Sequence, residues 1–416
     1  MKFQRPKGTK DILPADISKW HYVEKTIREV MNLFNFSEIR TPTYENTDLF
    51  SRGVGSETDI VGKEMYTFDD KGGNSLTLKP EGTASVIRAY LENGMAAESP
   101  ISKLYYITNM FRYEKPQAGR FREHSQFGGE ILGSDDVNSD IEIISLAQEV
   151  FHRCEIKNFK VKINSIGKSE ERRAYIELLK KYLKNYLNDL SDNSKRRYDT
   201  NPLRILDSKD TNDIKILNDA PKILDNLSNE SRDRFEKVLS GLKDINIDYE
   251  VDFKLVRGLD YYTDTTFEFI SEDLGAQDAI GGGGRYDGLV ELLGGKPTYG
   301  VGFGSGIERL IIVAEKNKFN FPAQEALKIF IIPAAEDAKA LTSKLCYDLR
   351  ENNISCENDL LGRSLKAQMR EANKLKAEFV FIIGEEELKK GKGILKKMSD
   401  GSQKEIPFDK LKEQVL

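Results

Sequence analysis

Between Tyr105 and Leu132, charged and polar side chains recur at alternating positions. Because strand side chains alternate between the two faces of a sheet, Arg112 and Glu114 should share one face of a first strand. The same pattern groups four polar side chains on the next strand, which are Arg122, His124, Gln126 and Glu130. The opposite face holds Phe111, Phe121, Phe127 and Ile131. The segment therefore predicts a hairpin whose polar face could bind a charged ligand, although an ordinary solvent-facing hairpin has the same pattern.

Glycines and a single arginine mark a second segment that could carry chemistry. Glycine lets a backbone or a ligand approach closely, as in the run Gly281–Gly284, although flexible loops use it too. Ser305 and Glu308 have the spacing of a capping box, which predicts a helix with Arg309 in its first turn. A cation there is unfavourable for the helix dipole. We expect Arg309 to have an anionic partner, although a surface arginine without a role fits the pattern as well.

Several elements must form before these residues can meet. Apolar spacing predicts helices over 17–34 and 84–91 and a short strand over 76–78. Residues 37–44 predict a strand that breaks at Pro42. Residues 168–245 are rich in Lys, Glu, Asp and Asn and place leucines and tyrosines at helical spacing, which predicts a helical insertion. Strands and glycine turns are expected over 250–316.

The end of the chain reads as a separate domain after a polar linker over 316–326. Strands and helices alternate there. The expected strands cover 328–332, 354–357 and 379–383, and the expected helices cover 338–351 and 364–375. This order predicts a small α/β domain with a largely parallel sheet.

Composition limits the class of protein. A chain of 416 residues is too long for one ordinary core, so two or three domains are expected. There is no apolar run of membrane-spanning length and no secretory signal at the start, which predicts a cytoplasmic protein. The three cysteines and three histidines lack metal-ligand spacing, so no protein-ligated zinc is expected. The net charge of −5 does not itself suggest nucleic-acid binding, but RNA binding needs only a local basic surface.

Two of these segments resemble signatures of the class II aminoacyl-tRNA synthetases. The pattern F-R-x-E, a loop and then G-R-F-R, over 111–122, resembles the second signature of that family. The string GFGSGIERL, over 302–310, resembles the third. Pro42 would be the proline of the much looser first signature, which lies at a dimer interface in the family. The resemblance implies ATP-dependent adenylation, Mg²⁺ on the phosphates and a homodimer.

Three further strings resemble the histidine-specific branch of this family, the histidyl-tRNA synthetases. They are TLKPEGT over 77–83, RGLDYY over 257–262 and GGRYDG over 283–288. The resemblance implies an α+β catalytic domain over 1–325, built on a mainly antiparallel sheet with the helical insertion. It also implies an α/β anticodon-binding domain over 327–416. L-histidine, ATP and tRNA(His) would be the substrates.

The family's residue roles carry over to matching positions. The implied phosphate-binding catalytic residues are Arg112, Arg257 and Arg309. The residues that would bind histidine are Glu81, Gly82, Thr83, Arg112, Gln126, Glu130, Arg257, Tyr261, Tyr262 and Tyr286. The residues that would bind ATP are Arg112, Glu114, Arg120, His124 and Arg309. Gln117 and Arg122 would meet the acceptor end of the tRNA. His124 departs from the family, which usually has an aromatic residue stacked on adenine there. It could stack, and at mildly acid pH it could also protonate.

Two other functions share parts of this pattern. A synthetase-like regulatory subunit of histidine biosynthesis would keep the fold and bind histidine, but would be expected to lose catalytic residues and the anticodon domain. An RNA-binding or stress-sensing module would not need the arginines that bind ATP. Arg257, Arg309 and the C-terminal domain favour the synthetase.

Overall fold

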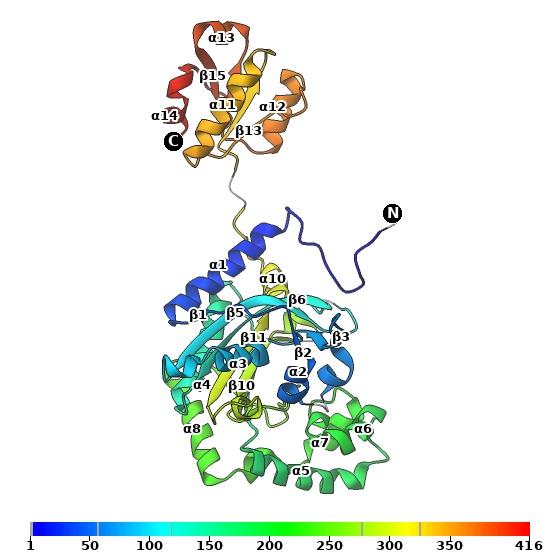
Figure 1. The fold of residues 1–416 in the computed structure, drawn as a ribbon. Helices are drawn as coiled ribbons and strands as arrows, with labels where there is room; N and C mark the ends of the chain where they lie inside the picture. Colours follow the sequence, from blue (N-terminus) through cyan, green and yellow to red (C-terminus); the bar gives the residue numbers. More distant parts are fainter. Residues whose placement is uncertain (1–2, 56–57, 118, 276–277, 324–325) are drawn as a thin grey trace. The chain divides into compact units, whose positions relative to one another are not determined.

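The computed structural model describes residues 3–55, 58–117, 119–275, 278–323 and 326–416. The chain divides into two compact units, Met1–Pro322 and Ala323–Leu416 (Figure 1). The predicted linker falls at this division, but its first residue, Lys316, is still helical, and residues 324 and 325 lie outside the described part. Among the described residues, no helix has the length and apolar character needed to cross a bilayer.

An eight-stranded sheet organises the first unit. Its order is β1 (Ser37–Glu38), β5 (Ser102–Phe111), β6 (Glu123–Leu132), β11 (Gly300–Gly306), β10 (Ala279–Arg285), β9 (Thr263–Ile270), β7 (Lys160–Ser165) and β8 (Tyr249–Val251). The edge pairs β1–β5 and β7–β8 are parallel, and the pairs between them are antiparallel. The prediction of a mainly antiparallel sheet is confirmed, and β5 and β6 are the predicted hairpin.

Four helices share an apolar core with this sheet. They are α1 (Ile17–Leu33), α4 (Val137–Arg153), α8 (Asn229–Asp244) and α10 (Ile307–Lys316). In α1 the residues Val23, Ile27 and Val30 recur every three or four positions and are fully buried, which is why this stretch is an amphipathic helix. Phe127 and Ile131 of β6 also lie in the core, as their spacing predicted. The alternate side chains of β6 therefore face away from these helices.

A smaller three-stranded sheet and two helices lie beside this core. The strands are β2 (Tyr44–Asn46), β4 (Ser75–Leu78) and β3 (Tyr66–Asp69), and the helices are α2 (Thr47–Val54) and α3 (Thr83–Glu92). The predicted break at Pro42 is present, because β1 and β2 belong to different sheets. Helix α3 begins at Thr83, so the segment 79–82 forms the link between β4 and α3.

The predicted helical insertion is confirmed. It contains α5 (Ser169–Leu183), α6 (Asp192–Thr200) and α7 (Thr211–Asn218), drawn in green in Figure 1, and ends with α8. Helix α8 packs into the main core, whereas α5 buries Tyr175, Leu179 and Leu183 in a second apolar cluster. That cluster also contains Tyr261 and Tyr262, so the insertion and the RGLDYY segment share one core.

The second unit has a five-stranded sheet. Its order is β13 (Cys356–Asn358), β12 (Ile329–Pro333), β14 (Phe379–Ile383), β15 (Lys392–Lys397) and β16 (Gln403–Pro407). Its helices include α11 (Ala338–Glu351), α12 (Leu365–Lys374), α13 (Glu385–Lys390) and α14 (Leu411–Val415). Only the pairs among β13, β12 and β14 are parallel. The prediction of a largely parallel sheet is therefore wrong, because the segment 384–391 is too short for a crossover and β15 returns antiparallel to β14.

Candidate active site

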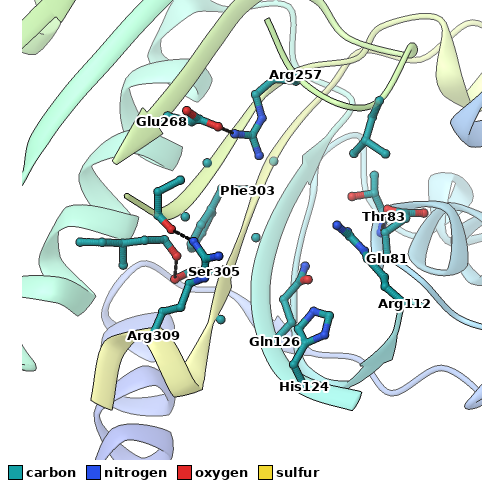
Figure 2. Close-up of a pocket in the computed structure, with 18 of the residues that line it drawn as sticks. Glu81, Thr83, Arg112, His124, Gln126, Arg257, Glu268, Phe303, Ser305 and Arg309 are labelled. Carbon is teal, nitrogen blue, oxygen red and sulfur yellow. Dashed lines mark hydrogen bonds and ion pairs between the residues drawn. The ribbon is translucent and has the colours of Figure 1, made fainter. Parts of the chain in front are cut away.

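A pocket of about 220 Å³ lies over strands β5, β6, β9, β10 and β11, on the face of the sheet turned away from the helical core (Figure 2). Glycines occupy most of the positions where β10 and β11 cross the pocket. A Cβ atom on Gly302 would overlap the carboxylate of Glu130, and one on Gly282 would lie 2.7 Å from Nη1 of Arg257. The glycine run is therefore required by close approach, which leaves room for a ligand on the strands.

At one end of the pocket, a buried carboxylate is held by two hydroxyl donors. Tyr286 Oη donates to Glu130 Oε2 at 2.5 Å, and Thr83 Oγ1 donates to Glu130 Oε1 at 2.8 Å. Burial raises the pKa of Glu130 to about 8, against the opposing effect of both donors. In its ionised form this group is an acceptor that suits a ligand bringing a ring N–H group into an apolar surrounding.

Three tyrosine rings stand next to this carboxylate. The ring centroids of Tyr261 and Tyr262 are 4.8 Å apart, and those of Tyr261 and Tyr286 are 5.7 Å apart and nearly perpendicular. A fourth tyrosine, Tyr106, accepts a hydrogen bond at its hydroxyl oxygen from Nε2 of Gln126 at 3.0 Å. The rings give the pocket an aromatic wall with polar tips.

Glu81 closes the same end of the pocket. Its carboxylate accepts hydrogen bonds from the backbone N–H groups of Thr83 and Ala84, both at 2.8 Å. These groups belong to the first turn of α3, where N–H groups have no partner within the helix. Glu81 therefore fixes the start of α3 and with it the side chain of Thr83. Burial raises the pKa of Glu81.

Arginines reach the pocket from different sides (Figure 2). Arg112 follows β5 and donates to the carbonyl of Pro80 at 2.7 Å. Arg257 comes from the RGLDYY segment and pairs with Glu268 of β9. Arg309 comes from the first turn of α10, as predicted, and donates to the carbonyls of Gly119 and Ala279. Three guanidinium groups in one pocket can bind several anionic oxygens at once.

A second cavity, of about 720 Å³, adjoins this cluster of arginines. It is lined by Arg112, Arg257 and Arg309 and also by residues of the insertion, among them Arg197 and Arg204. Arg120 and Glu114 line both cavities and form an ion pair at 2.8 Å. The pocket thus continues from an aromatic end into a wide space lined by many charged side chains, both arginines and carboxylates.

The predicted capping box is wrong. Ser305 lies in β11 and donates to the carbonyl of Ile280 at 3.0 Å. Glu308 accepts from the backbone N–H of Ser125 at 2.9 Å. Ser305 thus joins β11 to β10, and Glu308 joins α10 to β6, while α10 begins at Ile307 after the non-capping Gly306. The spacing was that of a cap, but Ser305 and Gly306 still belong to strand β11.

His124 lies in the pocket beside the arginines. Burial, together with the positive charges of Arg112 and Arg309, lowers the pKa of His124 to about 3. The expectation that this ring could protonate at mildly acid pH is therefore wrong. A neutral imidazole next to two guanidinium groups keeps a flat face that can stack on an aromatic ligand.

Several residues fall outside their expected positions. Phe121 precedes β6 and lines the pocket, so its assignment to the apolar face of the hairpin is wrong. Gln117 is exposed in the turn after Glu114, and Ala118 lies outside the described residues. Arg122 stacks 3.8 Å from the ring of Tyr113 and donates to the carbonyl of Glu114 at 3.2 Å. Gln117 and Arg122 are not among the described residues that line the pocket.

The lining residues that the sequence analysis did not assign to the site include Tyr106, Glu268 and Glu308. Tyr106 has the parity of Arg112 along β5, so the alternation rule would have found it had it been extended backwards. Glu268 is the carboxylate within the otherwise apolar segment TFEFI, over 266–270 of β9. Glu308 is half-buried and desolvation raises its pKa to about 7, but its spacing suggested a helix cap instead.

The sheet topology agrees with the class II aminoacyl-tRNA synthetase fold predicted from the sequence. A family model described as histidyl-tRNA synthetase matches residues 8–310, and one described as an anticodon binding domain matches 328–416. A histidine–tRNA ligase of Thermoanaerobacter pseudethanolicus is 49% identical over 415 residues, covering 100% of this chain and 99% of the relative. One from Acetivibrio thermocellus is 48% identical over 411 residues, covering 99% of both.

A solved structure agrees with these matches. The crystal structure of apo histidyl-tRNA synthetase from S. aureus has a TM-score of 0.84 and 38% identity, covering 99% of both chains. This chain belongs to the histidyl-tRNA synthetase family, whose members attach histidine to tRNA(His) by ATP-dependent aminoacylation.

Proposed function

We propose that this chain forms histidyl-adenylate from L-histidine and ATP in the pocket over β6, β10 and β11, and then transfers the histidyl group to tRNA(His). The observation that carries the proposal is one continuous site with a carboxylate–tyrosine cluster at one end and Arg112, Arg257 and Arg309 at the other. An aromatic end with a hydrogen-bond acceptor fits an imidazole, and a cationic end fits a triphosphate.

The imidazole of histidine is held at the aromatic end. Glu130 accepts from one ring nitrogen and the hydroxyl of Tyr262 faces the other, with Tyr261 and Tyr286 as walls. A site that hydrogen-bonds its substrate in this way rejects analogues that leave its polar groups unpaired, by roughly 10⁴–10⁵ in good cases. Glu81, Thr83 and Gln126 hold the α-amino group of histidine. Gly82 contributes the backbone that connects Glu81 to Thr83.

The carboxylate of histidine and the phosphates of ATP meet at the arginines. Arg112 and Arg257 bind the α-phosphate, and Arg309 binds the terminal phosphate with Arg120 as a further contact. Glu114 accepts from the adenine amino group and His124 stacks on the adenine ring. Mg²⁺ on the phosphates would meet an oxygen ligand from Glu268, which lines both cavities, and would offset the phosphate charge.

Catalysis of the first step rests on charge and position. The attacking carboxylate of histidine is already an anion, so no protein base is required. It attacks the α-phosphorus, and pyrophosphate leaves with the electron pair of the broken P–O bond. Two anions must approach in line, so fixed guanidinium groups supply most of the acceleration. In the second step a ribose hydroxyl at the tRNA 3′ end takes the histidyl group and AMP leaves.

The remaining assignments concern macromolecular partners. Gln117 and Arg122 meet the acceptor end of the tRNA, and residues 327–416 bind the anticodon loop, whose unpaired bases are natural targets of sequence-specific recognition. On α12 and just after it, Lys366, Arg370, Lys374 and Lys376 are exposed and available for this contact. The catalytic domain covers 1–325, the protein forms a homodimer, and its location is the cytoplasm.

Histidine-dependent ATP–pyrophosphate exchange tests the proposal, followed by charging of purified tRNA(His). Arg257→Ala should keep the fold but remove most of the exchange activity, because the developing charge at the α-phosphate loses its donor. Arg232→Ala, on the exposed surface of α8, is the matched control and should exchange normally. Near-normal exchange in Arg257→Ala would sink the assignment. Histidine binding without pyrophosphate exchange or tRNA charging would favour a histidine-binding regulatory subunit.

A further inference from the structure

The RGLDYY segment lies in a stretch that needs support from elsewhere. Residues 255–262 form neither a helix nor a strand, yet they carry Arg257, Tyr261 and Tyr262 into the pocket. Buried carbonyl groups in such a stretch require donors from other parts of the protein. The conformation of this segment is therefore set by whatever supplies those donors.

Much of the support comes from the helical insertion. Arg172, in the first turn of α5, donates from Nη1 to the carbonyl of Tyr262 at 2.5 Å and to the carbonyl of Asp260 at 3.2 Å. These two carbonyls flank Tyr261 in the chain. One guanidinium nitrogen thus fixes the backbone on both sides of a tyrosine that packs against Tyr286 in the pocket.

Further contacts from the insertion act on the same segment. Asn201, just after α6, donates to Asp260 Oδ1 at 3.0 Å. Nη1 of Arg204 stands so close to Gly258 that a Cβ atom there would lie 2.8 Å away. The three side chains Arg172, Asn201 and Arg204 line a cavity of about 280 Å³ behind the segment, on which Tyr262 and Arg257 also border. The insertion and the pocket thus meet on opposite sides of one irregular stretch of backbone.

We propose that Arg172 is a positioning residue for the histidine pocket, through which the helical insertion sets the backbone of residues 260–262. The inference rests on the proposed function, because it assigns Tyr261 and Tyr262 to histidine. Arg172 itself touches no substrate. Its guanidinium is rigid and planar, and holds two acceptors in a geometry that a lysine ammonium reproduces only in part. Without the Arg172 guanidinium, the segment samples conformers that do not bind histidine. The apparent affinity for histidine then falls in proportion to the fraction of molecules in the binding-competent conformer.

The test compares Arg172→Met with Arg232→Met, at an exposed arginine of α8 that is not among the residues lining this cavity. In histidine-dependent pyrophosphate exchange we expect Arg172→Met to raise KM for histidine about tenfold, with kcat and KM for ATP within about threefold of wild type. KM for histidine in Arg172→Lys should lie between the values of the wild type and Arg172→Met, and Arg232→Met should match the wild type.

Hydrogen exchange of the unliganded protein provides a second readout. Amides of residues 257–262 should exchange faster in Arg172→Met and slow again at saturating histidine, whereas α5 to α8 should be unchanged. If Arg172→Met does not fold, Arg172→Lys and Asn201→Ala carry the same test. An unchanged KM for histidine in an active protein would overturn the inference. The inference would also be overturned if hydrogen exchange were faster throughout α5 to α8 and the KM values for histidine and ATP were both raised. That result would mean that the insertion had lost its fold. Absence of histidine-dependent pyrophosphate exchange in the wild type would instead refute the proposed function.

Discussion

Tyr286, directly after β10, donates to Glu130 of β6 across a distance of 2.5 Å, and these two strands are not neighbours in the sheet. β11 lies between them, and its Gly302 leaves the gap through which the hydroxyl reaches the carboxylate. The chemistry of the pocket therefore depends on the absence of a side chain on the intervening strand.

Glu130 should make the stability of the protein depend on pH. Its pKa is raised from 4.5 to about 8 by burial, so folding favours the protonated form. The stabilisation is complete below about pH 4.5 and is lost as the pH rises through 8. Between pH 6 and 8.5 this group alone should lower the free energy of unfolding by about 2–3 kcal/mol. Urea unfolding at both pH values should show this loss in the wild type and not in Glu130→Gln. An equal change in the free energy of unfolding between the two pH values in both proteins would contradict the assignment.

Gly302→Ala should damage the pocket and strain the adjoining strand β6, because a Cβ atom would lie 2.8 Å from the carbonyl oxygen of Gly129. The added methyl group would overlap the Glu130 carboxylate, and overpacking of this kind costs about 1–3 kcal/mol. We expect KM for histidine to rise about 5- to 100-fold, with KM for ATP nearly unchanged, because the arginines lie at the other end. Gly288→Ala is the control, since a Cβ there meets no atom within 4 Å. Equal kinetics in the two variants would show that Glu130 can move aside.

Arg285 should be required for folding rather than for chemistry. It is fully buried and bonds Asp140 at 2.6 Å, Ser139 Oγ at 2.8 Å and Asp287 at 3.0 Å. Arg285→Met leaves Asp140 buried with one cation fewer and should destabilise the protein by about 3–5 kcal/mol. The double variant with Asp140→Leu should recover part of that loss in denaturant unfolding. A single variant as stable as the wild type would refute the role.

His124 should contribute to ATP binding without adding a pH dependence. With its pKa lowered to about 3, the ring is neutral throughout the working range. His124→Phe should keep KM for ATP near the wild-type value, whereas His124→Ala should raise it about 2- to 10-fold through lost stacking. KM for ATP should be measured from pH 5.5 to 8. An ionisation near pH 6 that disappears in His124→Phe would contradict the account.

The sequence by itself determined the elements and the chemistry of the site residues. The spacing of apolar residues predicted α1, the insertion and most of the second unit, because the buried positions of a helix or strand recur with a period that is visible within a short stretch of sequence. It also grouped Arg112, His124 and Glu130 by parity, and the RGLDYY string indicated the family.

The tertiary structure decided what no local pattern contains. Ser305 and Glu308 have the spacing of a cap, but their partners, Ile280 and Ser125, lie on other strands. The pKa of His124 depends on Arg309, which is distant in the sequence. Likewise, the donors that hold the backbone on both sides of Tyr261 belong to Arg172, and the sequence of its helix shows an apolar stripe and a solvated face but not this contact. Long-range neighbours set burial, charge and backbone support, and these appear only when the chain has folded.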